Sequence, residues 1–132
     1  QCLTLGNLYA VRDWGHAKDY VESMWKILQY KRPDDWVIAT NEEMTVKEFI
    51  NKCAKKLKID LLWKFKGIKE IAVDKNTKKI IIKIDKKYFR PGEVDFLKGD
   101  YSKAKKLLKW KPKYKSDDLI NDMIEYEKDL YE

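Results

Sequence analysis

Apolar side chains recur every three or four positions in four stretches of the chain, which is the spacing of a helix with one buried face. The first stretch follows Asp13, which we expect to cap the helix. Its apolar stripe consists of Ala17, Tyr20, Val21, Met24, Trp25 and Leu28. The second stretch opens with Thr45 and Glu48, the spacing of a capping box. Two further helices are predicted after Asp100 and from Ser116.

Short runs of apolar or alternating residues predict about five strands between these helices. The runs are residues 3–8, 36–39, 61–65, 69–73 and 80–84. Residues 36–39 are almost entirely apolar, which is typical of a strand covered on both faces. The last two runs flank a turn signal at 74–77 and predict a hairpin. About four helices and five short strands make the fold class α/β, with no internal repeat and no interdomain linker.

The composition is that of an ordered domain. The 132 residues are 44% hydrophobic and include 5 Gly and 3 Pro, which excludes a disordered or collagen-like chain. No run approaches about 18 apolar residues, and the polar first residues do not resemble a signal peptide. Two cysteines and one histidine do not make a zinc site. We therefore expect a cytoplasmic protein with reduced thiols and no membrane partner.

Basic residues outnumber acidic ones and are concentrated in the middle of the chain. The formal net charge is +7, and residues 45–115 carry 23 basic and 8 acidic side chains. Such a block is compatible with a small basic module that binds nucleic acid, which is one alternative function. However, 26 of the 29 basic residues are Lys, as on a solvated surface, and they do not interleave with aromatic residues as in single-strand binders. We therefore expect no nucleic-acid partner.

The chain offers few candidates for catalysis. Cys53 lies on the apolar stripe of the second helix and is interpreted as a buried structural thiol. His16, in the first turn of its helix, is interpreted as a partly exposed structural histidine. Tyr101 and Lys105 match Tyr-x-x-x-Lys, but Lys is so frequent here that such pairs arise by chance. We therefore assign no catalytic residue, metal ligand or cofactor ligand to this chain.

The arginines stand out because the chain contains only three of them. A position that keeps Arg in a lysine-rich chain is one where the planar guanidinium fork matters, as in bidentate binding of phosphate. Arg12 lies between a predicted strand and a helix, and Arg90 lies in an irregular loop with Glu93. Two such arginines, with a carboxylate on a ribose hydroxyl, would clamp a nucleoside diphosphate. The alternative is ordinary ion pairing with carboxylates such as Asp13 or Asp19.

Several segments, in order and at suitable spacing, resemble the GDP-mannose 4,6-dehydratases. They are residues 5–8 (LGNL), 12–21 (RDWGHAKDYV), 37–40 (VIAT), 88–95 (YFRPGEVD) and 99–112, which begins with GD and ends with LKWKP. The resemblance covers nearly the whole chain and is weakest over the lysine-rich residues 58–84. This family is similar to, and grouped with, the extended short-chain dehydrogenase/reductases, whose dinucleotide-binding half has a Rossmann fold.

The resemblance implies that residues 1–132 are the carboxy-terminal, substrate-binding portion of such an enzyme, with residues 13–40 completing the Rossmann sheet of an amino-terminal half. The family reaction converts GDP-mannose to GDP-4-keto-6-deoxymannose. Bound NADP oxidises C4, water is eliminated across C5–C6, and the hydride returns to C6. The family's glycine-rich NADP loop and catalytic Tyr-x-x-x-Lys precede the stretch that this chain matches, so we expect the isolated chain to be inactive.

By the same resemblance, four residues match substrate ligands of the family. Arg12 and Arg90 match pyrophosphate ligands, Glu93 matches a contact to the nucleoside ribose, and Asn7 lies where the guanosine would sit. The expected partners are therefore GDP-mannose and further copies of the enzyme, in a homodimer or homotetramer. Because an arginine clamp senses only the diphosphate, a related epimerase or dehydratase acting on another nucleoside diphosphate sugar is the alternative.

Overall fold

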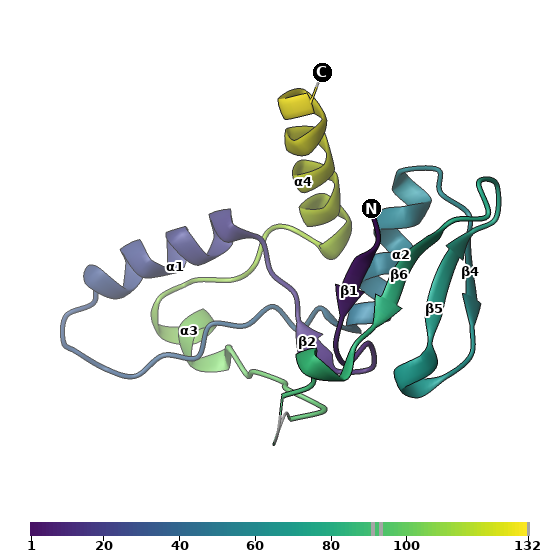
Figure 1. Cartoon of the computed structure of the whole chain (residues 1–132). Coiled ribbons are helices and arrows are strands. Elements are labelled where there is room, and N and C mark those ends of the chain that lie inside the picture. The colour runs from purple at the N-terminus through teal and green to yellow at the C-terminus, as the bar shows by residue number, and fades with distance from the viewer. Residues whose placement is uncertain (91, 93, 132) are drawn as a thin grey trace. The chain divides into compact units, whose positions relative to one another are not determined.

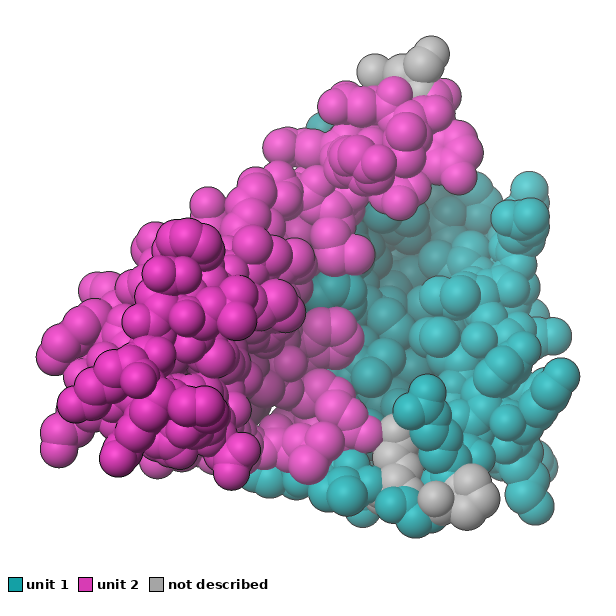
Figure 2. Space-filling model, turned by 90° about the vertical axis from the view of Figure 1, so that its left-hand side faces the viewer, with its two compact units in different colours: residues 1–10, 45–96 teal, residues 11–44, 97–132 magenta. Residues whose placement is uncertain are grey.

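The described residues form two compact units, each built from segments that are distant in the sequence. The structure, a computed structural model, describes residues 1–90, 92 and 94–131. Unit 1 comprises residues 1–10 and 45–96, and unit 2 comprises residues 11–44 and 97–132 (Figure 2). The described part of the chain contains four α-helices and six strands, close to the predicted four and five.

Unit 1 is a mixed sheet with one helix. Its elements are β1 (Leu3–Leu5), α2 (Val46–Lys56), β4 (Leu61–Lys64), β5 (Ile71–Asp74), β6 (Ile80–Ile84) and the 3-10 turns Gly67–Lys69 and Lys86–Tyr88. The strand order is β1-β6-β5-β4, in which β1 runs parallel to β6 and the other neighbours are antiparallel (Figure 1). The predicted hairpin is confirmed, because Ala72 of β5 lies opposite Ile82 of β6.

The predicted capping box begins α2. The backbone N–H of Glu48 donates to the Thr45 hydroxyl at 3.1 Å, and the Glu48 carboxylate accepts from the Thr45 N–H at 2.7 Å. The hydrogen bond from the Thr45 backbone also holds the pKa of Glu48 below its ordinary value. In the middle of α2, the Asn51 side chain accepts from the Trp63 indole N–H at 2.8 Å. This contact ties β4 to α2.

Unit 2 consists of three helices and a two-stranded sheet. Its elements are β2 (Val11–Asp13), α1 (Ala17–Leu28), β3 (Glu43–Thr45), α3 (Ser102–Leu107) and α4 (Ser116–Tyr131). Strand β2 pairs with β3, whose last residue is also the first residue of the second segment of unit 1. The helix predicted from Ser116 is confirmed, and its first turn carries Asp117 and Asp118 near the positive end of the helix dipole.

The core of unit 2 is centred on a tryptophan. The buried cluster is Ala104, Leu108 and Trp110. The Trp110 indole N–H donates to the backbone carbonyl of Asp19 at 2.9 Å. The Asp19 carboxylate is 1% exposed and accepts from the backbone N–H groups of Lys113 at 3.0 Å and Tyr114 at 3.1 Å. Both hydrogen bonds go to Oδ2, and they hold the segment after Trp110 on α1, whereas Oδ1 is buried without a hydrogen-bond partner among the described residues.

Residues 36–39 do not form the predicted strand. Within the described residues, this segment belongs to no ladder of the two sheets. Its apolar side chains are explained by packing instead: Ala39 is buried, and Trp36 and Ile38 lie against the Trp110 cluster. The segment is covered only in part, because Val37 is 52% exposed. A strand also requires a hydrogen-bonded neighbour, which the described residues do not supply.

Asp13 does not cap α1, because His16 takes that position. The Asp13 carboxylate instead accepts from the backbone N–H of Thr40 at 2.9 Å and of Asn41 at 2.8 Å. It also accepts from the Thr40 hydroxyl at 2.8 Å. Asp13 thus links β2 to the segment that precedes β3, a connection that no local pattern in the sequence indicates.

The apolar stripe predicted on α1 faces solvent in unit 2. The most exposed members of the stripe are Val21 (63%), Met24 (61%), Trp25 (63%) and Leu28 (77%). The buried residues of this helix are Asp19 and Ser23. A contiguous exposed apolar stripe such as that of α1 is typical of a surface that another protein segment covers.

No helix among the described residues combines the length and the apolar character needed to cross a membrane.

Candidate functional site

The parallel pair of strands in unit 1 brings two predicted site segments to one edge of the sheet. Leu5 lies opposite Ile84 at the end of both strands, and the Asp85 N–H donates to the Leu5 carbonyl at 2.9 Å. Asn7 follows β1 directly, and Arg90 follows the short turn after β6. The carboxyl ends of neighbouring parallel strands are a common place for ligand sites in α/β proteins.

Gly6 allows the loop after β1 to pass against the turn that leads to Arg90. A Cβ at this position would lie 2.2 Å from the backbone oxygen of Tyr88 and 2.8 Å from its carbonyl carbon. No side chain fits at such distances, so the close backbone approach requires glycine. The segment that carries Asn7 and the segment that carries Arg90 are therefore packed against each other.

Asn7 is half-buried and closes a turn within its own loop. Its side-chain oxygen accepts from the backbone N–H of Tyr9 at 2.9 Å, which is the geometry of an Asx turn. This hydrogen bond also identifies the oxygen and the nitrogen of the side-chain amide. The amide nitrogen makes no hydrogen bond within the described residues, so the group that Asn7 can offer to a ligand is a donor.

Arg90 is exposed at the end of its segment. It follows Phe89, which ends the 3-10 turn Lys86–Tyr88. Glu93, predicted to contact a ribose, lies outside the described residues. Of the residues expected to bind substrate, unit 1 therefore presents Asn7 and Arg90 on adjoining segments.

Arg12 belongs to unit 2, where it is the middle residue of β2. It is half-buried, and its guanidinium donates to the backbone carbonyl of Val11 at 2.8 Å. The two carboxylates considered as alternative ion-pair partners have structural roles: Asp13 accepts from residues 40 and 41, and Asp19 accepts from residues 113 and 114. Asp13, the residue after Arg12 in β2, therefore ties this strand to residues 40 and 41.

His16 is structural, as predicted, but it is buried rather than partly exposed. Its side chain is 5% exposed, and Nδ1 accepts from the Lys18 backbone N–H at 3.1 Å. Nε2 lies 3.1 Å from the Asp122 carboxylate of α4, and the ring stacks on Tyr114 at 4.4 Å. Hydrogen bonding from Lys18 is the main cause that holds the pKa of Asp122 below its ordinary value, with a smaller contribution from His16. Asp122 is therefore ionised at neutral pH, and the stability that its contacts contribute is lost only as the pH falls through this lowered pKa.

The cysteines provide no metal site. Both thiols are free, with Cys2 exposed and Cys53 half-buried. Burial raises the pKa of the Cys53 thiol, which keeps it protonated and unreactive at neutral pH. Across the described ranges, no three His, Cys, Asp or Glu side chains gather as metal ligands. Cys53 is therefore half-buried, whereas its place on the apolar stripe predicted a buried thiol.

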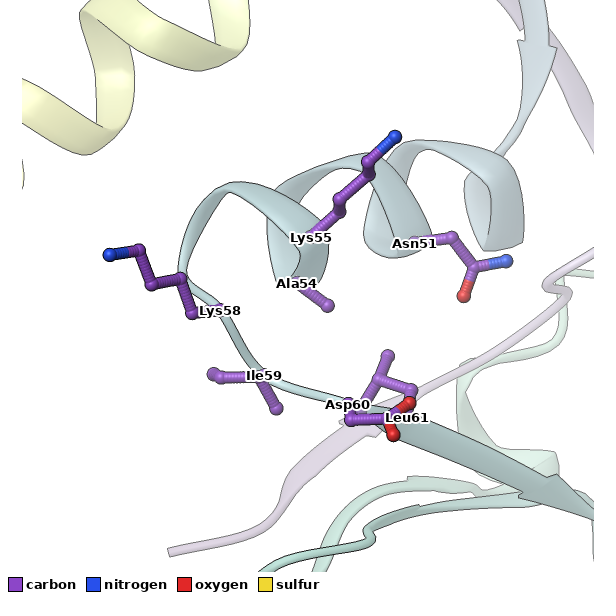
Figure 3. Close-up of a pocket in the computed structure, with 7 residues that line it drawn as sticks. All are labelled: Asn51, Ala54, Lys55, Lys58, Ile59, Asp60 and Leu61. Carbon is purple, nitrogen blue, oxygen red and sulfur yellow. The ribbon is translucent and has the colours of Figure 1, made fainter.

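A surface groove of about 430 Å³ lies elsewhere on unit 1, between the end of α2 and the start of β4 (Figure 3). It is lined by Asn51, Ala54, Lys55, Lys58, Ile59, Asp60 and Leu61. None of the predicted site residues lines this groove. Its two lysine side chains extend away from each other, so they do not converge on an anion (Figure 3).

The chain is similar in sequence to proteins of one family. A family profile described as GDP-mannose 4,6 dehydratase matches residues 1–123. The GDP-mannose 4,6 dehydratase of Cricetulus griseus is 48% identical over 130 residues, which cover 98% of this chain and 35% of that protein. The GDP-mannose 4,6 dehydratase of Homo sapiens is 47% identical with the same coverage. The chain therefore spans about a third of the length of these relatives.

Solved structures with lower sequence identity share the fold. The UDP-glucose 4-epimerase of Thermotoga maritima with UDP-glucose has a TM-score of 0.74 and 21% identity, covering 100% of this chain and 36% of that one. RMD from Pseudomonas aeruginosa complexed with NADPH has a TM-score of 0.69 and 14% identity, covering 93% and 34%. These likenesses make the chain an α/β fragment of the extended short-chain dehydrogenase/reductase fold, as the sequence predicted. With nearly half of its residues identical to those of curated relatives along almost its whole length, the chain belongs to the GDP-mannose 4,6-dehydratase family.

Proposed function

We propose that the chain is the carboxy-terminal, substrate-binding portion of a GDP-mannose 4,6-dehydratase and that it holds the GDP moiety of GDP-mannose. The observation that carries the proposal is the family match over residues 1–123. It is supported by the packing of the Asn7 segment against the segment that leads to Arg90. The complete reaction would convert GDP-mannose to GDP-4-keto-6-deoxymannose and water.

Two features of unit 2 support the proposed place of the chain within a larger enzyme. The exposed apolar stripe of α1 would be covered by the Rossmann sheet of an amino-terminal part. The apolar residues 36–39, which belong to no sheet among the described residues, would then find strand neighbours in the same sheet. Both features are expected of a chain that shares one sheet with a segment outside it.

NADP would be bound outside this chain, which has neither a Gly-x-x-Gly-x-x-Gly loop nor any other glycine-rich phosphate cradle. When bound, NADP supplies the site for the hydride that leaves C4 and returns to C6. The residues of this chain bind and orient the substrate. Arg12 and Arg90 would each present a guanidinium fork to the diphosphate, Glu93 would accept from the ribose, and Asn7 would donate to the nucleoside.

Measurements of binding and turnover test the proposal that this chain binds the substrate while NADP and the catalytic residues lie outside it. We expect the 132-residue chain, mixed with NADP and GDP-mannose, to bind GDP-mannose without forming product. A chimera in which the chain replaces the matching 130 residues of the Homo sapiens relative is expected to form GDP-4-keto-6-deoxymannose. Calorimetry measures the binding, and chromatography of the nucleotide sugars measures the product. Product formation by the chain alone, or a folded chimera that binds no GDP-mannose, would contradict the proposal.

The alternative nucleotide sugars are distinguished by competition. The arginine clamp senses only a diphosphate, and a similar fold occurs in a UDP-glucose 4-epimerase structure. Titration of GDP-mannose in the presence of UDP-glucose or dTDP-glucose therefore shows whether the affinity depends on the nucleoside base. We expect the GDP sugar to bind most tightly, because the family match is to GDP-mannose 4,6 dehydratase. The donor of Asn7 alone would not separate these bases, since guanine, uracil and thymine all offer carbonyl acceptors.

Substitution of Asn7 by aspartate separates the turn from base recognition. Aspartate keeps the oxygen that accepts from the Tyr9 N–H, but it replaces the donor amide by a second acceptor. We expect the affinity for GDP to fall about tenfold, because an acceptor then faces an acceptor on guanine. The affinity for ADP, whose adenine carries a donor at N6, is expected not to fall. Equal losses for GDP and ADP in calorimetry would show that Asn7 does not read the base.

A further inference from the structure

A buried glutamate joins the loop after β1 to two other elements of unit 1. Glu70, directly before β5, is 2% exposed. Its Oε2 accepts from the Tyr9 hydroxyl at 2.7 Å, and its Oε1 accepts from the Lys47 ammonium at 2.5 Å. A buried carboxylate is costly unless it is paired and hydrogen-bonded, and both carboxylate oxygens meet this condition.

Both partners of Glu70 are attached to the loop that carries Asn7. Tyr9 belongs to the loop, and its backbone N–H donates to the Asn7 side chain. Lys47 lies in the first turn of α2, and its backbone N–H donates to the Leu8 carbonyl at 2.9 Å. The flanking Leu8 and Ala10 are each 2% exposed. The loop is thus fixed by its backbone, its apolar side chains and the carboxylate of Glu70.

Lys47 also lies over two aromatic rings. Its ammonium lies 5.3 Å from the centre of the Tyr9 ring and 4.6 Å from the centre of the Trp63 ring. Burial disfavours the charged ammonium, but hydrogen bonds to Glu70 and Tyr9 outweigh it and raise the pKa of Lys47 above its ordinary value. The ammonium therefore stays charged throughout the neutral range and keeps its contact with the carboxylate.

We infer that Glu70 is a positioning residue for nucleoside binding, acting through Tyr9 and Lys47 to hold Asn7 in the conformation that presents its amide donor. This inference rests on the proposed function, because it concerns the same nucleoside contact. The hydrogen bonds that link the Glu70 carboxylate to the loop and to α2 are those of Tyr9 and Lys47. Glu70 would thus fix the conformation of the loop after β1 that carries Asn7. It would have no effect on the diphosphate ligands Arg12 and Arg90.

The substitution Tyr9→Phe tests the inference with little disturbance of packing. It removes the hydroxyl that donates to Glu70 and retains the ring beside Lys47. The matched control is Thr77→Val, which removes a hydroxyl that donates to the Asp74 carboxylate at 2.7 Å in the turn between β5 and β6. Each variant thus loses one hydroxyl–carboxylate hydrogen bond in unit 1, but only the first loss is at the loop. Glu70→Gln is a second variant, which keeps an oxygen acceptor and removes the charge.

Calorimetry on the full chain with GDP and with inorganic pyrophosphate gives the required comparison. For Tyr9→Phe and Glu70→Gln we expect GDP to bind roughly tenfold more weakly and pyrophosphate to bind as in the wild type. Thr77→Val is expected to bind both ligands as the wild type does. A purely structural role would weaken both ligands in parallel with the loss of folded protein, and that result would overturn the inference.

The outcomes also separate this inference from the proposed function. A wild-type chain that is folded and does not bind GDP refutes the proposed function, and the inference falls with it. A wild-type chain that binds GDP, with Tyr9→Phe binding equally tightly, refutes the inference alone. Faster hydrogen exchange at the backbone N–H groups of Tyr9 and Lys47 in Tyr9→Phe, and not in Thr77→Val, is the expected sign that the loop has lost its restraint.

Discussion

Replacement of Trp110 by alanine is expected to lower the free energy of unfolding of the isolated chain by about 3–5 kcal/mol. Trp110 is fully buried, and its ring meets Tyr101 edge-on with centroids 5.7 Å apart. Its indole N–H donates to the carbonyl of Asp19. Alanine therefore leaves a cavity in the core of unit 2 and removes the hydrogen bond of the indole to this carbonyl, and both effects act in the same direction.

Trp25→Ala is the matched control for this prediction. Trp25 is in the same unit but is 63% exposed on α1. We expect its removal to change the free energy of unfolding by less than about 1 kcal/mol in the isolated chain. Urea unfolding followed by far-ultraviolet circular dichroism measures both variants without relying on tryptophan fluorescence. Equal losses for the two variants would contradict the placement of the core on Trp110.

The same control extends to the proposed larger enzyme. If a Rossmann sheet covers the stripe of α1, Trp25 becomes buried and its replacement by alanine becomes costly. In the chimera with the Homo sapiens relative, we therefore expect Trp25→Ala to destabilise the protein by about 2 kcal/mol or more. Thermal unfolding of the chimera with and without the substitution measures this difference. An unchanged melting temperature would argue against the proposed position of the chain within the enzyme.

Elements defined by neighbouring residues were predictable from the sequence. The capping box of Thr45 and Glu48 spans one helical turn, so its pattern contains both partners of each hydrogen bond. The hairpin of β5 and β6 is encoded by two β-branched runs with a turn signal between them. In both cases the information that decides the structure lies within about a dozen residues.

Features that depend on distant partners were not predictable in the same way. Asp13 has a residue type that suits a helix cap, but its hydrogen-bond partners lie 27 and 28 positions further on. Residues 36–39 have the apolar composition of a strand, and whether they form one depends on a neighbour in space. The stripe on α1 was recognised correctly as apolar, although periodicity does not reveal whether the chain itself contains the surface that covers it.

In the candidate site, too, features that depend on local sequence were predictable and features that depend on distant partners were not. The scarcity of arginine predicts that the side-chain shape of Arg12 and Arg90 matters, and the resemblance implies that they bind the diphosphate; both remain predictions. Glu70 was missed, because it lies in a polar stretch and meets Tyr9 and Lys47 from 61 and 23 positions away. No local signal distinguishes it from Asp74, the other acidic residue of that stretch, and its burial and its two contacts support the role that we infer for it.

Substitution of Arg12 or Arg90 by lysine is expected to weaken the binding of GDP-mannose by about 1.5–3 kcal/mol each, or roughly 10- to 150-fold. Lysine keeps the positive charge, so the loss measures the planar fork that binds two phosphate oxygens at once. Arg32→Lys is the matched control, because Arg32 is the third arginine of the chain, is exposed, and has no predicted role in binding. Calorimetric titration of the three variants gives the comparison.

The double variant decides whether both arginines bind one ligand. Arg12 and Arg90 belong to different units, so the structure by itself does not couple them. Two independent effects would add, whereas two arginines on the same diphosphate are expected to show a coupling energy of about 0.5 kcal/mol or more in a double-mutant cycle. Unchanged affinity in both single variants would contradict the clamp. Losses that add without coupling would show that the two arginines act on separate parts of the substrate, and the assignment of one of them to the diphosphate would then be wrong.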